Sequence, residues 1–282
     1  MGVKKKRFLL KCVYHVVVAF LAFVMCYPLI WMLFSSFKET KTIFVTATEL
    51  LPREFVFHNY LNGWKGFGGI SFATFFGNSI FVSVLCVFGI VVSSTLVAYG
   101  FARIHFKGSK IWFSCMLLSM MIPFQVLMVP QYIMFNKFGW IGTMLPLIVP
   151  CFFGNGFGIF LTVQFIKGIP KELDEAAKID GCSHWGIFQR IILPLIVPAL
   201  VTNGIFAFIG KWDDFMSALL YLNKPKQYTL ALALKLFCDP SSSSDWGAMF
   251  AMSILSLIPV FLIFIFFQKY LVEGISSSGL KG

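Results

Sequence analysis

Six long apolar stretches set the tightest limit on how this chain can fold. A helix that spans a membrane needs about 20 apolar residues. Six stretches of the 282-residue chain reach that length, at roughly residues 12–34, 73–101, 111–135, 143–166, 195–220 and 247–271. Hydrophobic residues make up 58% of the sequence and charged residues only 12%, a balance that soluble domains do not have. The sequence therefore predicts an all-α polytopic membrane protein with six transmembrane helices.

Prolines occur inside two of these stretches. The third contains Pro123 and Pro130, and the fourth contains Pro146 and Pro150. Membrane helices tolerate proline where neighbouring groups satisfy the freed backbone. We therefore expect kinked helices at these positions.

The lysine and arginine residues between the apolar stretches predict the orientation. Fourteen lie on the side that carries both termini and residues 167–194, and eight lie on the other side, whose loops are longer. Positive residues collect on the cytoplasmic side of a membrane. This bias predicts a cytoplasmic tail at 1–11, a first transmembrane helix at 12–34, an external loop at 35–72, a transmembrane core at 73–271 and a cytoplasmic tail at 272–282.

Several functional classes are excluded or disfavoured. The net charge of +11 comes from residues between apolar runs, which is typical of membrane topology and not of nucleic-acid binding. The seven cysteines have no paired spacing, and the four histidines are scattered without a metal-binding pattern. No G-x-x-x-x-G-K-[ST] phosphate loop is present. The sequence thus predicts neither an ATPase nor another enzyme, and no bound metal.

Residues 169–198 are polar amid apolar surroundings, and they predict two short helices joined by a bend. Three acidic residues, Glu172, Asp174 and Glu175, suit the first turn of a helix. Gly181 can take the left-handed conformation that ends a helix, and Ser183 can cap the next one. Pro194 is expected to interrupt the chain before it becomes apolar again.

The same segment resembles a known family. Glu175-Ala176-Ala177, Gly181 and Ile191-x-Leu193-Pro194 match the spaced EAA…G…I-LP motif of the permeases of binding-protein-dependent ABC importers. Four further residues are similar to the carbohydrate-uptake, MalG-type version of that motif: Asp180, Phe188, Leu195 and Pro198. An ordinary amphipathic cytoplasmic loop is the alternative reading.

In that family this loop, here 167–194, contains the coupling helix that docks into the ATPase subunit. The resemblance implies that the coupling residues are Glu175, Ala176, Ala177, Asp180, Gly181, Ile191, Leu193 and Pro194. It also implies the type I ABC importer permease fold and sugar import into the cytoplasm of a bacterial cell by alternating access. The implied partners are a homologous second permease, two ATPase subunits that bind ATP and magnesium, an external solute-binding protein and the lipid bilayer. No cofactor is expected in this chain.

Five residues are candidates for the translocation path: Gln125, Gln131, Asn203, Trp212 and Asp213. Uncharged amides inside membrane helices either line a polar path or bond between helices. Trp212-Asp213-Asp214-Phe215 resembles a family pattern that has asparagine where this chain has Asp213. A lysine–aspartate pair at the membrane surface is the other reading of the charges here.

Two further segments resemble the family. Pro52 and Asn59-Tyr60 of the external loop are similar to its segment between helices one and two, which either tethers the loop or touches substrate. The small-residue tail, with Gly279, Lys281 and Gly282, is similar to the tail that reaches between the ATPases in maltose-type permeases. A frayed tail without function is the alternative.

An ion-coupled secondary transporter of a small polar solute is the alternative function. Such a transporter needs ionisable residues near the middle of the membrane. The acidic residues of this chain lie in predicted loops or near the outer surface, which favours the ATP-driven importer.

Overall fold

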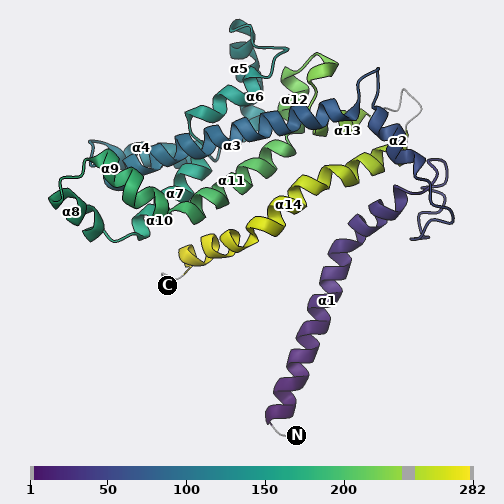
Figure 1. Cartoon of the computed structure of the whole chain (residues 1–282), viewed down its shortest axis with the longest axis horizontal. Coiled ribbons are helices and arrows are strands. Elements are labelled where there is room, and N and C mark those ends of the chain that lie inside the picture. Colours follow the sequence, from purple (N-terminus) through teal and green to yellow (C-terminus); the bar gives the residue numbers. More distant parts are fainter. Residues whose placement is uncertain (1–2, 237–244, 280–282) are drawn as a thin grey trace. The chain divides into compact units, whose positions relative to one another are not determined.

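The computed structural model describes residues 3–236 and 245–279, and every named element in these ranges is a helix or a helical turn (Figure 1). The predicted all-α fold is therefore confirmed. The chain divides into two compact units. The first is built from the described parts of Met1–Phe72 and Leu234–Leu257, and the second from those of Ala73–Ala233 and Ile258–Gly282.

The first unit contains α1 (Val3–Ser35), α2 (His58–Lys65) and the beginning of α14 (Trp246–Gly279). The segment between α1 and α2 has no long helix, but buried polar groups hold it. Lys38, 3% exposed, donates hydrogen bonds to the carbonyls of Thr46 and Glu49. Asn59 Nδ2 donates to the carbonyls of Ser36 and Lys38, at 2.8 Å each. Asn59 therefore ties the start of the loop to α2, which favours the tethering role for residues 35–72, called the external loop below after the position that the sequence predicts for them.

The second unit holds the remaining helices. They are α3 (Phe72–Arg103), α4 (Ser109–Ser119), α5 (Phe124–Lys137), α6 (Leu145–Ile148), the 3₁₀ turn η1 (Val149–Phe153), α7 (Gly156–Gly168), α8 (Glu172–Ile179), α9 (His184–Ile187), the π-helical turn η2 (Phe188–Ile192), α10 (Leu193–Leu195), α11 (Val197–Trp212), α12 (Phe215–Tyr221), the 3₁₀ turn η3 (Pro225–Gln227), most of α13 (Leu230–Leu236) and the later part of α14.

Within the described residues, four helical segments are long and apolar enough to span a membrane: Arg7–Ser35, Phe72–Arg103, Leu145–Gly168 and Trp246–Tyr270. Two further pairs of helices pass the same test together, although each pair is sharply bent. The predicted six spans are reached only if each bent pair counts as one span.

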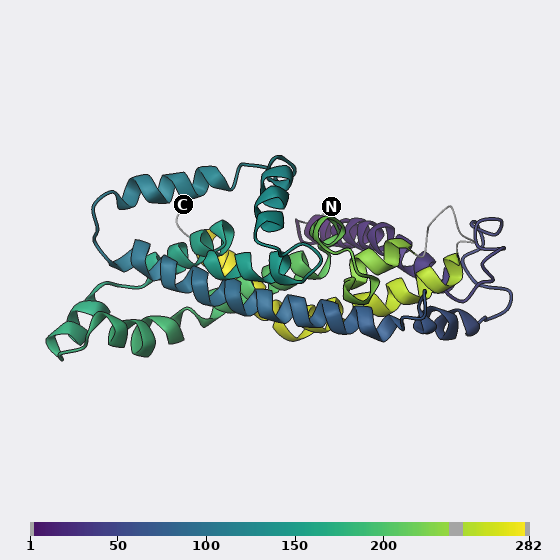
Figure 2. The ribbon, with the colours of Figure 1, turned by 90° about the horizontal axis from the view of Figure 1, so that it is seen from above.

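The third span is not the kinked helix that the sequence predicts. α4 and α5 meet at 99°, and Figure 2 shows α5 turning sharply away from α4. Pro123 stands at the break with an extended backbone, at φ −67° and ψ 143°. Proline lacks an N–H group and disfavours a helical conformation in the residue before it. Pro123 therefore lies in the break and immediately precedes α5, whereas Pro130 lies inside α5.

The fifth predicted span, 195–220, is also broken. α11 ends at Trp212, and Asp214 begins α12 by accepting a hydrogen bond from the Ser217 N–H at 3.0 Å. A second bend, of 73°, separates His184–Leu195 from α11. Residues 169–195, which contain α8, α9, η2 and α10 and are called the coupling segment below after their predicted role, are therefore separate from α11.

Two apolar clusters form the core of the second unit. One packs the end of α3 against α7, the π-helical turn η2 and the residue before α11, with Tyr99, Ile166, Phe188, Ile192 and Ile196 among its members. The other packs the first half of α3 against α5, α6 and α12, with Val82, Phe135, Leu147 and Tyr221 among its members. α3 contributes to both clusters and so runs the length of this unit (Figure 1).

Candidate functional site

The helix–turn–helix that follows α7 has the caps that its sequence predicts. Gly181 takes a left-handed conformation at φ +80°. The N–H groups of Gly181 and Cys182 bond to the carbonyls of Lys178 and Ala177, at 3.0 and 2.9 Å, which is the pattern of a Schellman motif. Ser183 Oγ accepts a hydrogen bond from the Gly186 N–H at 3.2 Å. The predicted bend is therefore confirmed, with both helix ends satisfied.

The acidic residues lie in the first turn of α8, as expected, but they have different surroundings. Glu172 and Glu175 are exposed, whereas Asp174 is buried. Arg103 Nε, at the end of α3, lies 2.6 Å from Asp174 Oδ2, and the two side chains are only 5% and 11% exposed. The N–H of Nε makes no aligned hydrogen bond. The short contact is therefore an ion pair within the apolar end of the bundle.

Two hydrogen bonds reinforce this ion pair. Arg103 Nη2 donates to the Ile169 carbonyl at 2.8 Å, just before α8. Tyr99 OH donates to the His184 carbonyl at 2.9 Å, in the first turn of α9, while its ring packs against Phe188 with centroids 5.0 Å apart. We call Tyr99, Arg103 and Asp174 the α3 latch. It holds the coupling segment at three points to the end of α3.

Below the latch, the inner side of the segment is apolar. Ala177 is buried in the apolar cluster at the end of α3, and Ile191 and Leu193 are half-buried against that cluster. These three motif residues therefore pack the segment onto the bundle.

Pro194 does not interrupt the helix, contrary to expectation. The helical path continues from α9 through the π-helical turn into α10, and Pro194 lies within α10. A π-helical turn shifts the backbone hydrogen-bond pattern by one residue. The helix can therefore pass a proline, and the chain bends later, at Ile196.

The outer side of the segment is acidic and apolar. Glu175, Ala176, Asp180 and Gly181 are all exposed. They lie beside Ile179, which is 87% exposed, and near Leu173 and Trp185, which are also exposed. Seven of the eight predicted coupling residues are thus divided between an outer side and an inner packing side, and the eighth, Pro194, is exposed in α10. We call Leu173, Glu175, Ala176, Ile179 and Asp180 the outer face.

The five translocation-path candidates have different environments. Gln125 and Asp213 are exposed. Gln131 Oε1 accepts a hydrogen bond from Tyr221 OH at 3.1 Å, so it bonds between helices. Trp212 is buried and stacks on Phe208.

Asn203 is 1% exposed, and its Nδ2 has no hydrogen-bond partner. It lines a cavity of about 240 Å³ with Asn155 and Lys211, and the other four candidates are not among the lining residues. Lys211 Nζ lies 3.4 Å from Asp214 Oδ2, so the structure contains the lysine–aspartate pair that the alternative reading predicts. Asn203 is the path candidate that combines a cavity with an unused polar atom.

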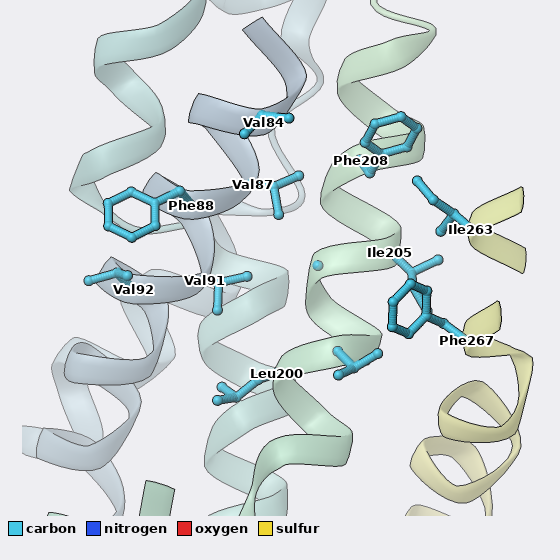
Figure 3. A pocket seen from close by; sticks show the side chains of 12 residues that line it. Val84, Val87, Phe88, Val91, Val92, Leu200, Ile205, Phe208, Ile263 and Phe267 are labelled. Carbon is cyan, nitrogen blue, oxygen red and sulfur yellow. The ribbon is translucent and has the colours of Figure 1, made fainter. Parts of the chain in front are cut away.

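A larger cavity, of about 510 Å³, lies between α3, α11 and α14 (Figure 3). Its labelled side chains are valine, leucine, isoleucine and phenylalanine, including Val87, Phe88 and Phe208. Such a surface offers no side-chain partner for a sugar hydroxyl, and unpaired polar groups are costly in apolar surroundings. The larger cavity therefore does not suit a polar solute.

Of the three C-terminal residues predicted to contact the ATPase, the structure describes only Gly279. α14 continues to Gly279, beyond residue 271, where the last predicted span ends. Lys281 and Gly282 lie outside the described residues. Within the part of the chain that the structure describes, no group of three metal-ligating residues is found.

Sequence reasoning missed the latch residues Tyr99 and Arg103. In the sequence, Arg103 is one of the fourteen positive residues that predict the orientation, and this bias does not indicate a partner for it. One residue does indicate a partner. Asp174 is acidic but lies on the same face of α8 as Ala177, about one helical turn later, and this face is buried.

Comparison with known proteins places the chain in a family. Residues 87–277 match the family model of the binding-protein-dependent transport system inner membrane component. The arabinooligosaccharide transport permease AraQ of Halalkalibacterium halodurans is 31% identical over 94% of this chain and 94% of its own length. The trehalose/maltose transport permease MalG of Thermococcus litoralis is 32% identical over 97% and 98%, respectively.

A solved structure supports the fold. A bacterial ABC transporter involved in importing the acidic polysaccharide alginate contains a chain that aligns with a TM-score of 0.79, at 22% identity, over 96% of this chain and 98% of that one. The relatives are transport permeases and not enzymes. The chain is a multi-pass membrane protein that belongs to the family of binding-protein-dependent transport system inner membrane components, the permease subunits of ABC importers.

Proposed function

We propose that this permease carries an oligosaccharide or other sugar into the cytoplasm. The relatives named for arabinooligosaccharides and for trehalose and maltose support this substrate class, because the similarity extends over nearly the whole of both chains. A homologous second permease, two ATPase subunits and an external solute-binding protein complete the transporter. The ATPase subunits bind ATP and magnesium, and this chain supplies none of that chemistry.

The outer face of the coupling segment docks onto an ATPase subunit. The observation that carries this proposal is the pairing of exposed acidic and apolar residues, Glu175 and Ile179, with an inner side that is firmly packed. Exposed apolar side chains beside charges are typical of protein interfaces. The lysine and arginine bias supports a cytoplasmic position for this segment and for both termini.

Transport proceeds by alternating access. When the two ATPase subunits bind ATP, they close against each other and push the coupling segment. The helices packed on this segment then move as rigid bodies. The bundle then opens outward as the binding protein delivers its sugar. When the bundle opens inward again, the cavity lined by Asn203 and Lys211 offers polar contacts to the hydroxyl groups of the sugar along its path.

Transport in proteoliposomes tests the proposal. Proteoliposomes that contain the complete transporter enclose ATP. The binding protein and radiolabelled arabinotriose, maltose or trehalose are added outside. Uptake of at least one sugar should require ATP and should stop when the phosphate-loop lysine of the ATPase is replaced. Uptake that follows an imposed proton or sodium gradient without ATP would contradict the proposal and favour the ion-coupled alternative.

A further inference from the structure

We propose that α3 is a strut that carries movement from the coupling segment to the residue 226–230 segment at its other end. The α3 latch is the attachment at one end, and Asn78 and Ser79 are the attachment at the other. The inference rests on the proposed docking of the coupling segment onto an ATPase. It adds the route by which the docked segment acts across the membrane, and it assigns these residues a positioning role.

The two ends of α3 are fastened in a similar way. At one end, Tyr99 and Arg103 reach the backbone carbonyls of His184 and Ile169. At the other, Asn78 Nδ2 donates to the carbonyls of Lys226 and Tyr228, at 2.8 and 3.0 Å. Ser79 Oγ, beside it, accepts a hydrogen bond from the Leu230 N–H at 2.7 Å. Side chains of one helix thus hold the backbone of two connecting segments that are far apart in the sequence.

The distance between the two attachments matches the thickness of a membrane. Ser79 and Tyr99 are 20 residues apart, which corresponds to about 30 Å along a helix at 1.5 Å per residue. The hydrocarbon core of a bilayer is also about 30 Å thick. α3 has no proline, the residue that most often kinks a helix. It contributes to both apolar clusters, and Figures 1 and 2 show it as one continuous helix. An unbroken helix that is attached near both of its ends transmits a displacement from one end to the other.

The charge pair in the latch suits positioning better than simple stabilisation. A buried ion pair adds little stability over an apolar pair of the same size. The planar arginine side chain, however, fixes directions at two points. Here it reaches the Asp174 carboxylate on α8 and the Ile169 carbonyl before α8. The latch therefore sets the angle between α8 and α3, and α8 cannot tilt on its own.

The experiment follows the far end of α3 while nucleotide acts on the ATPases. Lys226, which is exposed, is replaced by cysteine in a chain whose native cysteines are replaced by alanine, within the complete transporter. The labelling rate by a membrane-impermeant maleimide is measured without nucleotide and with magnesium and a non-hydrolysable ATP analogue. In the otherwise unchanged chain, the nucleotide should alter this rate. No alteration would overturn the proposal.

Three variants then cut the strut. Asp174→Asn removes the charge at one end, Tyr99→Phe removes the hydroxyl but keeps the ring, and Ser79→Ala removes the acceptor at the other end. Each should reduce the nucleotide-dependent change in labelling about fivefold, the lower end of the range for coupling between sites. Co-purification of the ATPase should stay within about twofold. Glu172→Gln, an exposed acidic residue of the same turn as Asp174, is the matched control and should change neither quantity.

The double variant Asp174→Asn/Ser79→Ala separates transmission from general destabilisation. Distant sites with no shared partner usually have additive effects. If α3 is the strut, the double variant should be no worse than either single one, because one cut already breaks the connection. Additive losses, unchanged labelling in all variants, or loss of ATPase binding in the latch variants would each overturn the proposal. Failure of the unaltered chain to co-purify with the ATPase would instead contradict the proposed function.

Discussion

The coupling segment and the external loop solve the same problem in different ways. Both connect membrane helices, and both use buried polar groups to secure an irregular backbone. The external loop folds around Lys38, whose ammonium group bonds to two carbonyls of that loop. The coupling segment is held from outside, by Tyr99 and Arg103 of α3.

This difference separates two purposes. A loop that supplies most of its own polar contacts depends less on its neighbours, although Trp31 of α1 also donates a hydrogen bond to the Ala47 carbonyl. A segment whose polar contacts come from a long neighbouring helix must move with that helix. We therefore expect changes in the coupling segment to affect transmission between subunits, and changes in the external loop to affect the stability of the first unit.

The largest expected effect is that of Glu175→Ala on ATPase docking. Glu175 is exposed on the outer face and has no role in packing the bundle. Removing one partner of a buried charged pair at an interface typically costs about 2–5 kcal/mol. Binding of the ATPase should fall by at least an order of magnitude in a pull-down titration, with unchanged membrane insertion. Glu172→Ala, in the same turn, is the control. Equal binding by Glu175→Ala and the unaltered chain would remove Glu175 from the interface.

Asn59→Leu should destabilise the first unit and leave ATPase binding unchanged. The substitution leaves the carbonyls of Ser36 and Lys38 without their buried donor, which costs about 1–3 kcal/mol. Thermal unfolding in detergent should begin at a lower temperature, and proteolysis within residues 36–57 should accelerate, while ATPase binding stays normal. His58→Leu, at an exposed neighbouring position, is the control. Weaker ATPase binding in Asn59→Leu would break the proposed separation of roles.

Gly181→Val should have a smaller effect, limited to the coupling segment. A side chain at φ +80° is strained, although no atom lies within 4 Å of the added Cβ. The strain is about 1–2 kcal/mol. Substrate-stimulated ATP hydrolysis should fall by less than with Glu175→Ala. Gly168→Ala, where the Cβ also meets open space without a left-handed backbone, should leave hydrolysis unchanged. Full stimulation in Gly181→Val would show that the bend has no part in coupling.

The smallest effect is expected from Arg53→Gln in the external loop. Arg53 pairs with Glu49 at 2.7 Å, but both side chains are well exposed. The hydrogen bond from Arg53 lowers the pKa of Glu49. The pair therefore contributes above the ordinary pKa of a glutamate, and its contribution disappears as the pH falls through the lowered pKa. Because exposed ion pairs contribute little, the unfolding temperature of Arg53→Gln at neutral pH should match that of the unaltered chain. A clear decrease would mean that the loop depends on its surface charges as well as on Lys38.

The sequence predicts local features of the coupling segment better than its attachments. Gly181 and Ser183 act through their own backbone neighbourhood, so the bend could be predicted from spacing alone. The latch joins residues between 66 and 85 positions apart, and periodicity carries no information about such pairs. Pro123 and Pro194 show the same limit. Pro123 lies in a break between two helices, whereas Pro194 lies on a continuous helical path. That path depends on a π-helical turn, which the motif residues do not predict.

The most direct test of the account is a cross-linking measurement at the tip of the outer face. Ile179→Cys is introduced into a chain whose seven native cysteines are replaced by alanine, and the complete transporter is treated with a short bifunctional maleimide. The account predicts a cross-link between position 179 and an ATPase subunit carrying cysteines around its docking cleft, and none for Ile187→Cys, which is 1% exposed. Labelling of position 179 from outside the cell, or a cross-link to the binding protein, would contradict it.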